Sequence, residues 1–226
     1  KSKVKTGDPK VFYFRQNSAA SHIDICDMKK TNFENAKILH VSGITAALSK
    51  SSQEACFWAI EKAQQCKMKV TFDPNIRRNL WKSEEEMRSV LNRIAFRSEI
   101  ILPGIAEGKI LTKKERVEDI ADFYLEKGVQ VVVIKLGALG AYYKTSDGVG
   151  AYVKGFSVSR VIDTIGAGDA FASGFLSGIL ENLSIHDSVV RGNAMGAIIV
   201  TSKTDNHDLP TKLELEEYLE HVRLLA

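Results

Sequence analysis

The segment from Val129 to Leu136 constrains the fold more than any other part of the chain, because it reads Val-Gln-Val-Val-Val-Ile-Lys-Leu. Apolar residues that follow one another without alternation place apolar side chains on both faces of a strand. Such a strand must be covered on both sides, as is typical of a central strand in a parallel sheet. The segment therefore predicts an α/β fold built on a mainly parallel sheet.

Strand-like and helix-like segments alternate along the rest of the chain. We expect strands at 38–42, 69–72 and 100–102, and helices at 51–66, 83–97 and 114–127. A hairpin is predicted around Asp147-Gly148, from strands at 141–144 and 151–153. Three helices are expected after it, at about 167–182, 184–202 and 211–224. This order predicts a three-layer α/β/α sandwich that forms one domain over residues 1–226.

Ligands of such sheets bind beyond the carboxyl ends of the strands. Asp73, Pro103-Gly104 and Gly137 each follow a predicted strand, so we expect them to share one rim of the domain.

Composition narrows the class of protein. The net charge is only +3 and the basic residues are scattered among acidic ones, which argues against a nucleic-acid partner. The sequence has no membrane-length apolar stretch and no signal peptide. Three cysteines without C-x-x-C spacing argue against a structural zinc site and against a disulfide framework, and they favour a reducing compartment. We therefore expect a soluble cytoplasmic protein.

The heptad Asp163-Thr-Ile-Gly-Ala-Gly-Asp169 precedes an apolar helical run. A glycine-rich turn that opens into a helix presents backbone N–H groups at the positive end of the helix dipole, and it can bind an anion there. A carboxylate would be expected to repel that anion, so Asp169 needs another role, such as taking the proton of an alcohol that attacks a phosphate. The residues alone leave open a capped helix start without chemistry.

Two further segments carry arginines that can bind an anionic group. Arg77 and Arg78 follow the strand at 69–72 in the turn Asp73-Pro-Asn-Ile, and an arginine there could bind a carboxylate with both nitrogens. Arg15 ends an early apolar run. Solvated surface arginines are the alternative at both places.

Three weaker signals concern a nucleotide and a metal. The segment Lys135-Leu-Gly-Ala-Leu-Gly140 lets a ligand approach its glycine backbone, or is simply a turn. Neither a Walker A nor a Rossmann motif is present, so any nucleotide is held differently. Glu107 could hold a water shell around Mg²⁺ or merely complement a helix dipole. Asn193 lies among small residues that suit either a flat ring or tight helix packing.

The heptad with Ala170-Phe171 resembles the second signature of the PfkB (ribokinase-like) carbohydrate kinases, a highly specific motif. The segments at 73–77, 13–15 and 40–49 resemble the form seen in 2-keto-3-deoxygluconate kinases. The matching segments span residues 13 to 210. The resemblance implies a ribokinase-like fold.

The resemblance also implies roles for the heptad. Asp169 would be the general base for the sugar hydroxyl. The N–H groups of Gly166, Ala167 and Gly168 would form the anion hole for the γ-phosphoryl group. Asp163 matches an acidic residue near a monovalent-cation site.

Substrate and nucleotide contacts are implied in the same way. Arg15 and Arg77 match contacts to the substrate carboxylate and hydroxyls, with Tyr13 beside them. The residues implied for ATP binding, besides Gly166 and Gly168, are Lys135, Gly137, Gly140 and Asn193, the last near adenine.

The chain departs from the family at three places. The Asn-x-x-Glu motif reads Gly104-Ile-Ala-Glu107, so only the acid, expected to contact Mg²⁺ through water, remains. Asp205 resembles part of a Gly-Asp-Asn-Glu-Gly segment near the nucleotide and cation, whose other positions are largely changed. The family's opening strands, its Gly-Gly substrate motif and most of its lid would precede Lys1. Residues 1–20 would then be the remnant of the lid and substrate-contact region, and 21–226 the core.

The resemblance implies Mg²⁺- and ATP-dependent phosphorylation of a sugar acid, with 2-keto-3-deoxygluconate as first choice and its 6-phosphate as product. Two arginines favour an acidic sugar over a neutral one. Another PfkB kinase, such as a fructokinase or ribokinase, is the near alternative, and a non-catalytic nucleotide- or sugar-binding fragment is the distant one. A homo-oligomer through the lid is also implied.

Overall fold

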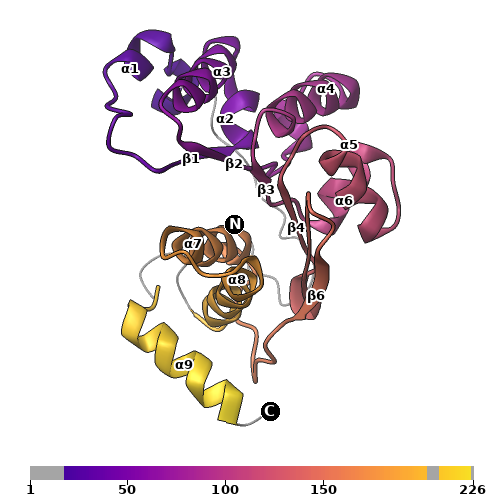
Figure 1. Cartoon of the computed structure of the whole chain (residues 1–226). Helices are drawn as coiled ribbons and strands as arrows, with labels where there is room; N and C mark the ends of the chain where they lie inside the picture. The colour runs from indigo at the N-terminus through magenta and orange to yellow at the C-terminus, as the bar shows by residue number, and fades with distance from the viewer. Residues whose placement is uncertain (1–17, 203–208, 225–226) are drawn as a thin grey trace. The chain divides into compact units, whose positions relative to one another are not determined.

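The computed structural model describes residues 18–202 and 209–224, with side chains up to residue 220 (Figure 1). The chain divides into two compact units. In the described residues, the unit that we call the N-unit comprises 18–134 and 144–150. The C-unit comprises 135–143, 151–202 and 209–224.

Six strands form one sheet in chain order. They are β1 (Ile38–Ser42), β2 (Lys69–Asp73), β3 (Ile100–Ile101), β4 (Val131–Lys135), β5 (Gly140–Thr145) and β6 (Gly150–Lys154). The first four strands are parallel, with Ile38 opposite Lys69, Thr71 opposite Ile100, and Ile100 opposite Val131. The last two are the predicted hairpin, closed by a hydrogen bond from the Thr145 N–H to the Val149 carbonyl (2.8 Å). The α/β prediction is confirmed, and the sheet is mixed.

The strand β4 is covered as its sequence predicts. Val131 to Ile134 are all buried, and the last three of these residues have no exposed surface. In the N-unit this strand belongs to a core with fully buried side chains from several elements: Ile60, Phe72, Leu91, Ile94, Ile101 and Ile120. Because consecutive residues point to opposite faces of a strand, full burial of consecutive residues requires cover on both faces.

The helices of the N-unit are α1 (Ile25–Lys29), α2 (Gly43–Leu48), α3 (Lys50–Gln65), α4 (Glu84–Ala95), α5 (Ile105–Thr112) and α6 (Val117–Leu125). The expected helix at 114–127 is shorter, and α5 precedes it. Lys113, at φ 60°, takes the left-handed conformation that ends α5. Helix α2 was not anticipated, because six residues are too few for a periodic pattern.

The C-unit contains α7 (Ala167–Leu180), α8 (Ile185–Val200) and α9 (Lys212–Leu224). Helices α7 and α8 approach each other closely at glycines. A Cβ on Gly174 would lie 2.6 Å from Met195 Cγ, one on Gly178 2.7 Å from Ser188 Oγ, and one on Gly192 3.0 Å from the Phe171 ring. At Gly192, the small side chain of α8 therefore allows tight packing against α7.

Helix α9 is joined to α7 and α8 by apolar contacts and by ion pairs. Leu215 packs in a cluster with Ala170, Ala194, Met195 and Ile199. Glu181, at the end of α7, pairs with Lys212 (3.0 Å) and Arg191 (3.1 Å). The hydrogen bond from Lys212, together with Arg191, holds the pKa of the Glu181 carboxyl below its ordinary value. None of the helices in the described ranges is long and apolar enough to cross a membrane.

The turn between β4 and β5 depends on Gly140. Its φ is 102°, and a Cβ there would lie 2.1 Å from the Val153 carbonyl oxygen and 2.4 Å from the Gly155 nitrogen. Gly137, in the 3₁₀ turn Gly137–Leu139, also has a positive φ of 63°, but a Cβ there would meet no described atom within 4 Å.

Gly140→Ala is expected to destabilise the protein more than Gly137→Ala. The first substitution adds a backbone clash to the strain of a positive φ, for a cost of about 2 kcal/mol or more. The second adds only the strain, on the order of 1 kcal/mol. Urea midpoints of the two variants measure the difference, and equal midpoints would contradict this account of the turn.

Cys56 is expected to resist thiol reagents in the native protein. It is buried, and burial raises the pKa of its thiol to about 12, so the reactive thiolate is scarce at neutral pH. A variant with Cys26→Ser and Cys66→Ser leaves Cys56 as the only thiol. Labelling with a chromogenic disulfide at pH 7.5 should be negligible before urea is added and complete afterwards. Rapid labelling without urea would show that this part of the core opens.

Candidate active site

The heptad lies at the start of α7. Gly166 is the N-cap, with φ 83°, and Ala167, Gly168 and Asp169 are the first three helical residues. The first N–H groups of an α-helix have no acceptor within the helix, and they form the positive end of its dipole. The Ala167 N–H makes a weak contact with the Thr164 carbonyl (3.4 Å), and the first helical bond runs from the Ala170 N–H to the Gly166 carbonyl (2.8 Å). The turn has the geometry of an anion site.

The chain that leads into this turn is fixed to the end of α8. The N–H groups of Ile162 and Asp163 donate to the Val200 carbonyl (2.7 and 3.3 Å). The Asp163 Oδ1 then accepts the N–H of Ile165 (3.1 Å), which closes a local turn. Asp163 therefore shapes the turn, and its contact with a monovalent cation stays a prediction.

Asp169 occupies the third position of α7 and is exposed. A carboxylate in a first helical turn is stabilised by the helix dipole. It lies in the same turn as the N–H groups that could hold an anion, so one turn carries both a proton acceptor and an anion site. This arrangement suits proton removal from an alcohol next to a phosphate.

Lys135 brings a positive charge to this turn. Its Nζ lies 3.6 Å from the position that a Cβ on Gly168 would occupy, so the ammonium group reaches the first turn of α7 from the end of β4. The resemblance placed Lys135 in the nucleotide loop, but the sequence did not predict that its ammonium group lies near Gly168.

Asn193 is buried on α8, and its amide Nδ2 donates to the carbonyls of Val153 (3.2 Å) and Lys154 (3.3 Å). The side chain ties α8 to the end of β6. Gly196 leaves the helix close to the heptad, since a Cβ there would lie 3.5 Å from the Ala167 carbonyl oxygen. The position of Asn193 near adenine stays a prediction.

Arg77 belongs to the N-unit, in the segment that follows β2. Asp73 is buried and its Oδ1 accepts the Asn75 N–H (3.2 Å), and Asn75 takes a positive φ of 40°. Arg77 is half-buried, and its Nη1 donates to the Ile76 carbonyl (2.9 Å). The guanidinium is therefore oriented partly by its own backbone.

Glu107 joins this segment to the segment after β3. Its Oε1 accepts the Ile76 N–H (2.7 Å), and its Oε2 accepts the Gly104 N–H (2.8 Å). Asp73 and Gly104, two members of the predicted rim, are thus brought together within one unit. The negative charge of Glu107, after burial, also contributes to raising the pKa of the Tyr124 hydroxyl.

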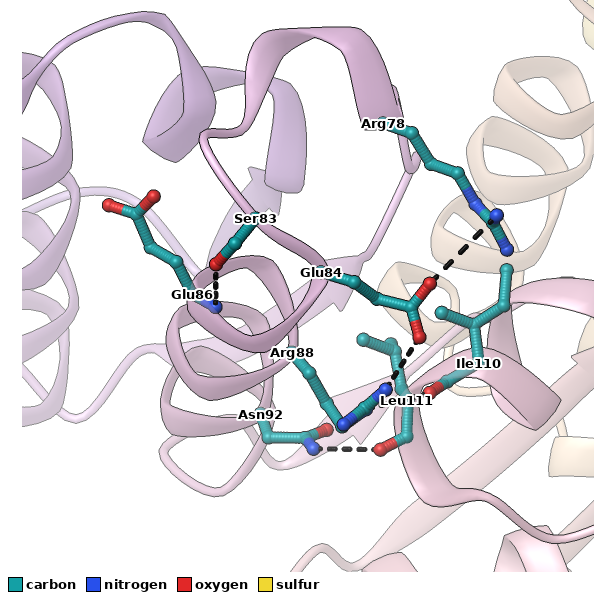
Figure 2. Close-up of polar contacts among 8 residues, drawn as sticks. All are labelled: Arg78, Ser83, Glu84, Glu86, Arg88, Asn92, Ile110 and Leu111. Carbon is teal, nitrogen blue, oxygen red and sulfur yellow. Dashed lines mark hydrogen bonds and ion pairs between the residues drawn. The ribbon is translucent and has the colours of Figure 1, made fainter.

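A polar cluster on α4 was missed by the sequence reasoning (Figure 2). Arg88 Nε donates to the Ile110 carbonyl and Asn92 Nδ2 to the Leu111 carbonyl, both at 3.0 Å, at the end of α5. Glu84 pairs with Arg88 (2.6 Å) and more distantly with Arg78 (3.9 Å). The i,i+4 spacing of Glu84 and Arg88 signals their pair, but nothing in the sequence signals the bonds to α5.

Three predicted site residues, Tyr13, Arg15 and Asp205, lie outside the described residues, so their substrate and cation roles stay predictions. Within 18–202 and 209–224, no group of three or more His, Cys, Asp or Glu side chains is arranged to hold a metal ion. The contact of Glu107 with Mg²⁺ through water also stays a prediction.

Comparison with known proteins shows the family of the chain. The pfkB family carbohydrate kinase model matches residues 3–212. A 2-dehydro-3-deoxygluconokinase of Bacillus subtilis (strain 168) is 44% identical over 219 residues, which cover 97% of this chain and 67% of the relative.

Two solved structures are also similar. A PfkB protein of Polaromonas sp. JS666 has a TM-score of 0.82 at 38% identity, covering 93% of this chain and 67% of that chain. A fructokinase double mutant of Vibrio cholerae O395, in its fructose, ADP and potassium ion bound form, has a TM-score of 0.83 at 28% identity, covering 90% and 66%. The chain spans about two thirds of the length of these relatives. It therefore belongs to the pfkB family of carbohydrate kinases.

Proposed function

We propose that the protein with this chain transfers the γ-phosphoryl group of ATP to a hydroxyl of a sugar acid, converting 2-keto-3-deoxygluconate to its 6-phosphate. One observation carries the proposal: the first turn of α7 combines Asp169, the N–H groups of an anion site, and the Lys135 ammonium near Gly168. Phosphoryl transfer depends on positioning, on charge stabilisation around the transferring group, and on a group that accepts the proton of the nucleophile.

Each part of the turn has its own role in this reaction. Asp169 takes the proton of the attacking hydroxyl. The N–H groups of Gly166, Ala167 and Gly168 donate to the oxygens of the phosphoryl group, where negative charge is greatest during transfer. Lys135 adds a positive charge beside Gly168. Because these groups sit on a packed helix and strand, they need little reorganisation when the reaction occurs.

ATP would lie along Lys135, Gly137 and Gly140, with Asn193 near its base. Bound Mg²⁺ would neutralise phosphate charge, and such an ion needs only one or two carboxylates because the phosphates supply its other ligands. The potassium ion and ADP named with the Vibrio cholerae fructokinase support a nucleotide and a monovalent cation here, the latter near Asp163 or Asp205.

Arg77 and the similarity to a 2-dehydro-3-deoxygluconokinase support a sugar acid as the substrate. The names 2-dehydro-3-deoxygluconate and 2-keto-3-deoxygluconate denote the same compound. A guanidinium binds a carboxylate through two parallel hydrogen bonds, a contact that a neutral sugar does not offer. A fructokinase activity is the second candidate, because the named fructokinase structure superimposes on most of the chain. ATP-dependent phosphorylation of the two sugars, measured side by side in the full-length protein, distinguishes them.

Asp169→Asn is expected to lower kcat by about 10²- to 10⁴-fold, because the amide cannot accept the proton of the hydroxyl. ATP binding, measured by calorimetry, should stay near normal because the backbone anion site is retained. Asp187→Asn is the matched control, since Asp187 also lies in the first turn of a helix, where it accepts a hydrogen bond from Ser184. A loss in kcat below about tenfold for Asp169→Asn would rule out the general-base role.

Arg77→Ala is expected to raise the KM for 2-keto-3-deoxygluconate by about 10- to 100-fold, the effect of losing hydrogen bonds to a charged group. Turnover of fructose, which has no carboxylate, should change much less. Arg78→Ala is the control, because that side chain is exposed and pairs only distantly with Glu84. An equal loss with both sugars would show that Arg77 does not bind the carboxylate.

A further inference from the structure

Glu107 uses both oxygens of its carboxylate on backbone N–H groups from two separate segments. Oε2 binds Gly104, three residues before it, and Oε1 binds Ile76, thirty-one residues before it. Both bonds are short (2.8 and 2.7 Å), as expected when the acceptor is charged. The side chain therefore fastens the segment after β2 to the start of α5.

The direction of this side chain follows from the start of α5. The N-cap is Gly104, which has no side chain to cap the helix. Glu107, at the third helical position, reaches back to the Gly104 N–H, as the acid of a capping box does. This bond orients the carboxylate so that its second oxygen meets Ile76.

The segment from Asp73 to Ile76 is held at each residue before Arg77. Gly43 lies so close that a Cβ on it would be 2.0 Å from the Pro74 carbonyl oxygen. Asp73 accepts the Asn75 N–H, and Glu107 accepts the Ile76 N–H. The carbonyl of Ile76 in turn accepts Nη1 of Arg77. Ile76 thus connects Glu107 to the guanidinium through its own backbone.

Helix α5 can act as a fixed support for this contact. Its C-terminal carbonyls at Ile110 and Leu111 are bound by Arg88 and Asn92 of α4 (Figure 2). Asn92 also accepts the Tyr124 hydroxyl of α6 (3.1 Å), and Tyr124 is fully buried. Because the C-terminal end of α5 is held in this way, a change at Glu107 is expected to affect the other segment that it binds, which is the segment that carries Arg77.

We propose that Glu107 is a positioning residue for the sugar acid: it fixes the Ile76 peptide and thereby the Arg77 guanidinium that receives the substrate carboxylate. The inference rests on the proposed function. A positioning role for Glu107 and a contact of Glu107 with Mg²⁺ through water would have different kinetic effects. A positioning residue changes the KM for the sugar, whereas a metal contact changes the dependence on Mg²⁺ concentration.

Glu107→Gln in the full-length protein tests this difference. The amide has nearly the same shape but turns an N–H₂ group towards one of the two backbone N–H groups. We expect the KM for 2-keto-3-deoxygluconate to rise about tenfold, the effect of losing one hydrogen bond to a charged group, with kcat and the half-saturating Mg²⁺ concentration changed by less than about twofold. Glu115→Gln is the matched control, because Glu115 is exposed and pairs with Lys109 on the surface. A shift in Mg²⁺ dependence without a change in KM would overturn the proposal.

A double-mutant cycle with Arg77→Ala tests whether Glu107 acts through Arg77. In the Arg77→Ala background, Glu107→Gln should raise the KM no further, because the group that it positions is gone. Independent, additive increases would show that Glu107 affects the substrate by another route and would overturn the proposal.

Hydrogen exchange at the Ile76 amide gives a readout that needs no activity. In the wild-type protein this amide should be protected more strongly than the amide of Arg78, and Glu107→Gln should speed its exchange by about tenfold. An unprotected Ile76 amide in the wild-type protein would overturn the inference even if the variant failed to fold. If the wild-type protein phosphorylates no sugar acid, the proposed function fails, and the exchange result still decides whether Glu107 holds this segment.

Discussion

The N–H groups at the start of α7 are the constraint on which the candidate site depends. They have no acceptors in their own helix, so water or a bound anion can accept hydrogen bonds from them. Gly166 turns the chain into the helix at a positive φ, and the bonds from Ile162 and Asp163 to Val200 aim that turn from the end of α8. The ammonium of Lys135 then lies near Gly168. A phosphate-sized anion is the ligand that such a combination of donors favours.

This turn can stay in place only if α7 is held rigidly. The glycines between α7 and α8 let the two backbones approach, and α9 is joined to both through Leu215 and through Glu181. Close packing transmits small displacements, so the position of Asp169 depends on residues further along α7 towards its C-terminus. Small side chains in α7 and α8 thus fix the helix that carries Asp169.

Two carboxylates show how the surroundings assign different roles to one chemical group. Asp169 stands exposed in the first turn of a helix, and the proposed function gives it the proton of the attacking hydroxyl. Glu107 directs both oxygens to backbone N–H groups, in bonds that hold two loops together. Both residues occupy the third position of a helix.

Local rules account for what the sequence by itself determined. Apolar residues on both faces predicted the buried strand β4, Asp147-Gly148 predicted the hairpin, and the glycines of the heptad predicted the start of α7, because each depends on side chains or dihedral preferences within a few residues. The break between α5 and α6 was not predicted. It depends on the left-handed conformation of Lys113, and a lysine in the sequence does not indicate that conformation. Only the tertiary structure decided that Glu107 reaches Ile76, that Asn193 binds the end of β6, and that Lys135 stands beside Gly168. These contacts join residues some thirty or more positions apart. They exist because of how whole elements pack against one another, which no short-range pattern in a single sequence specifies.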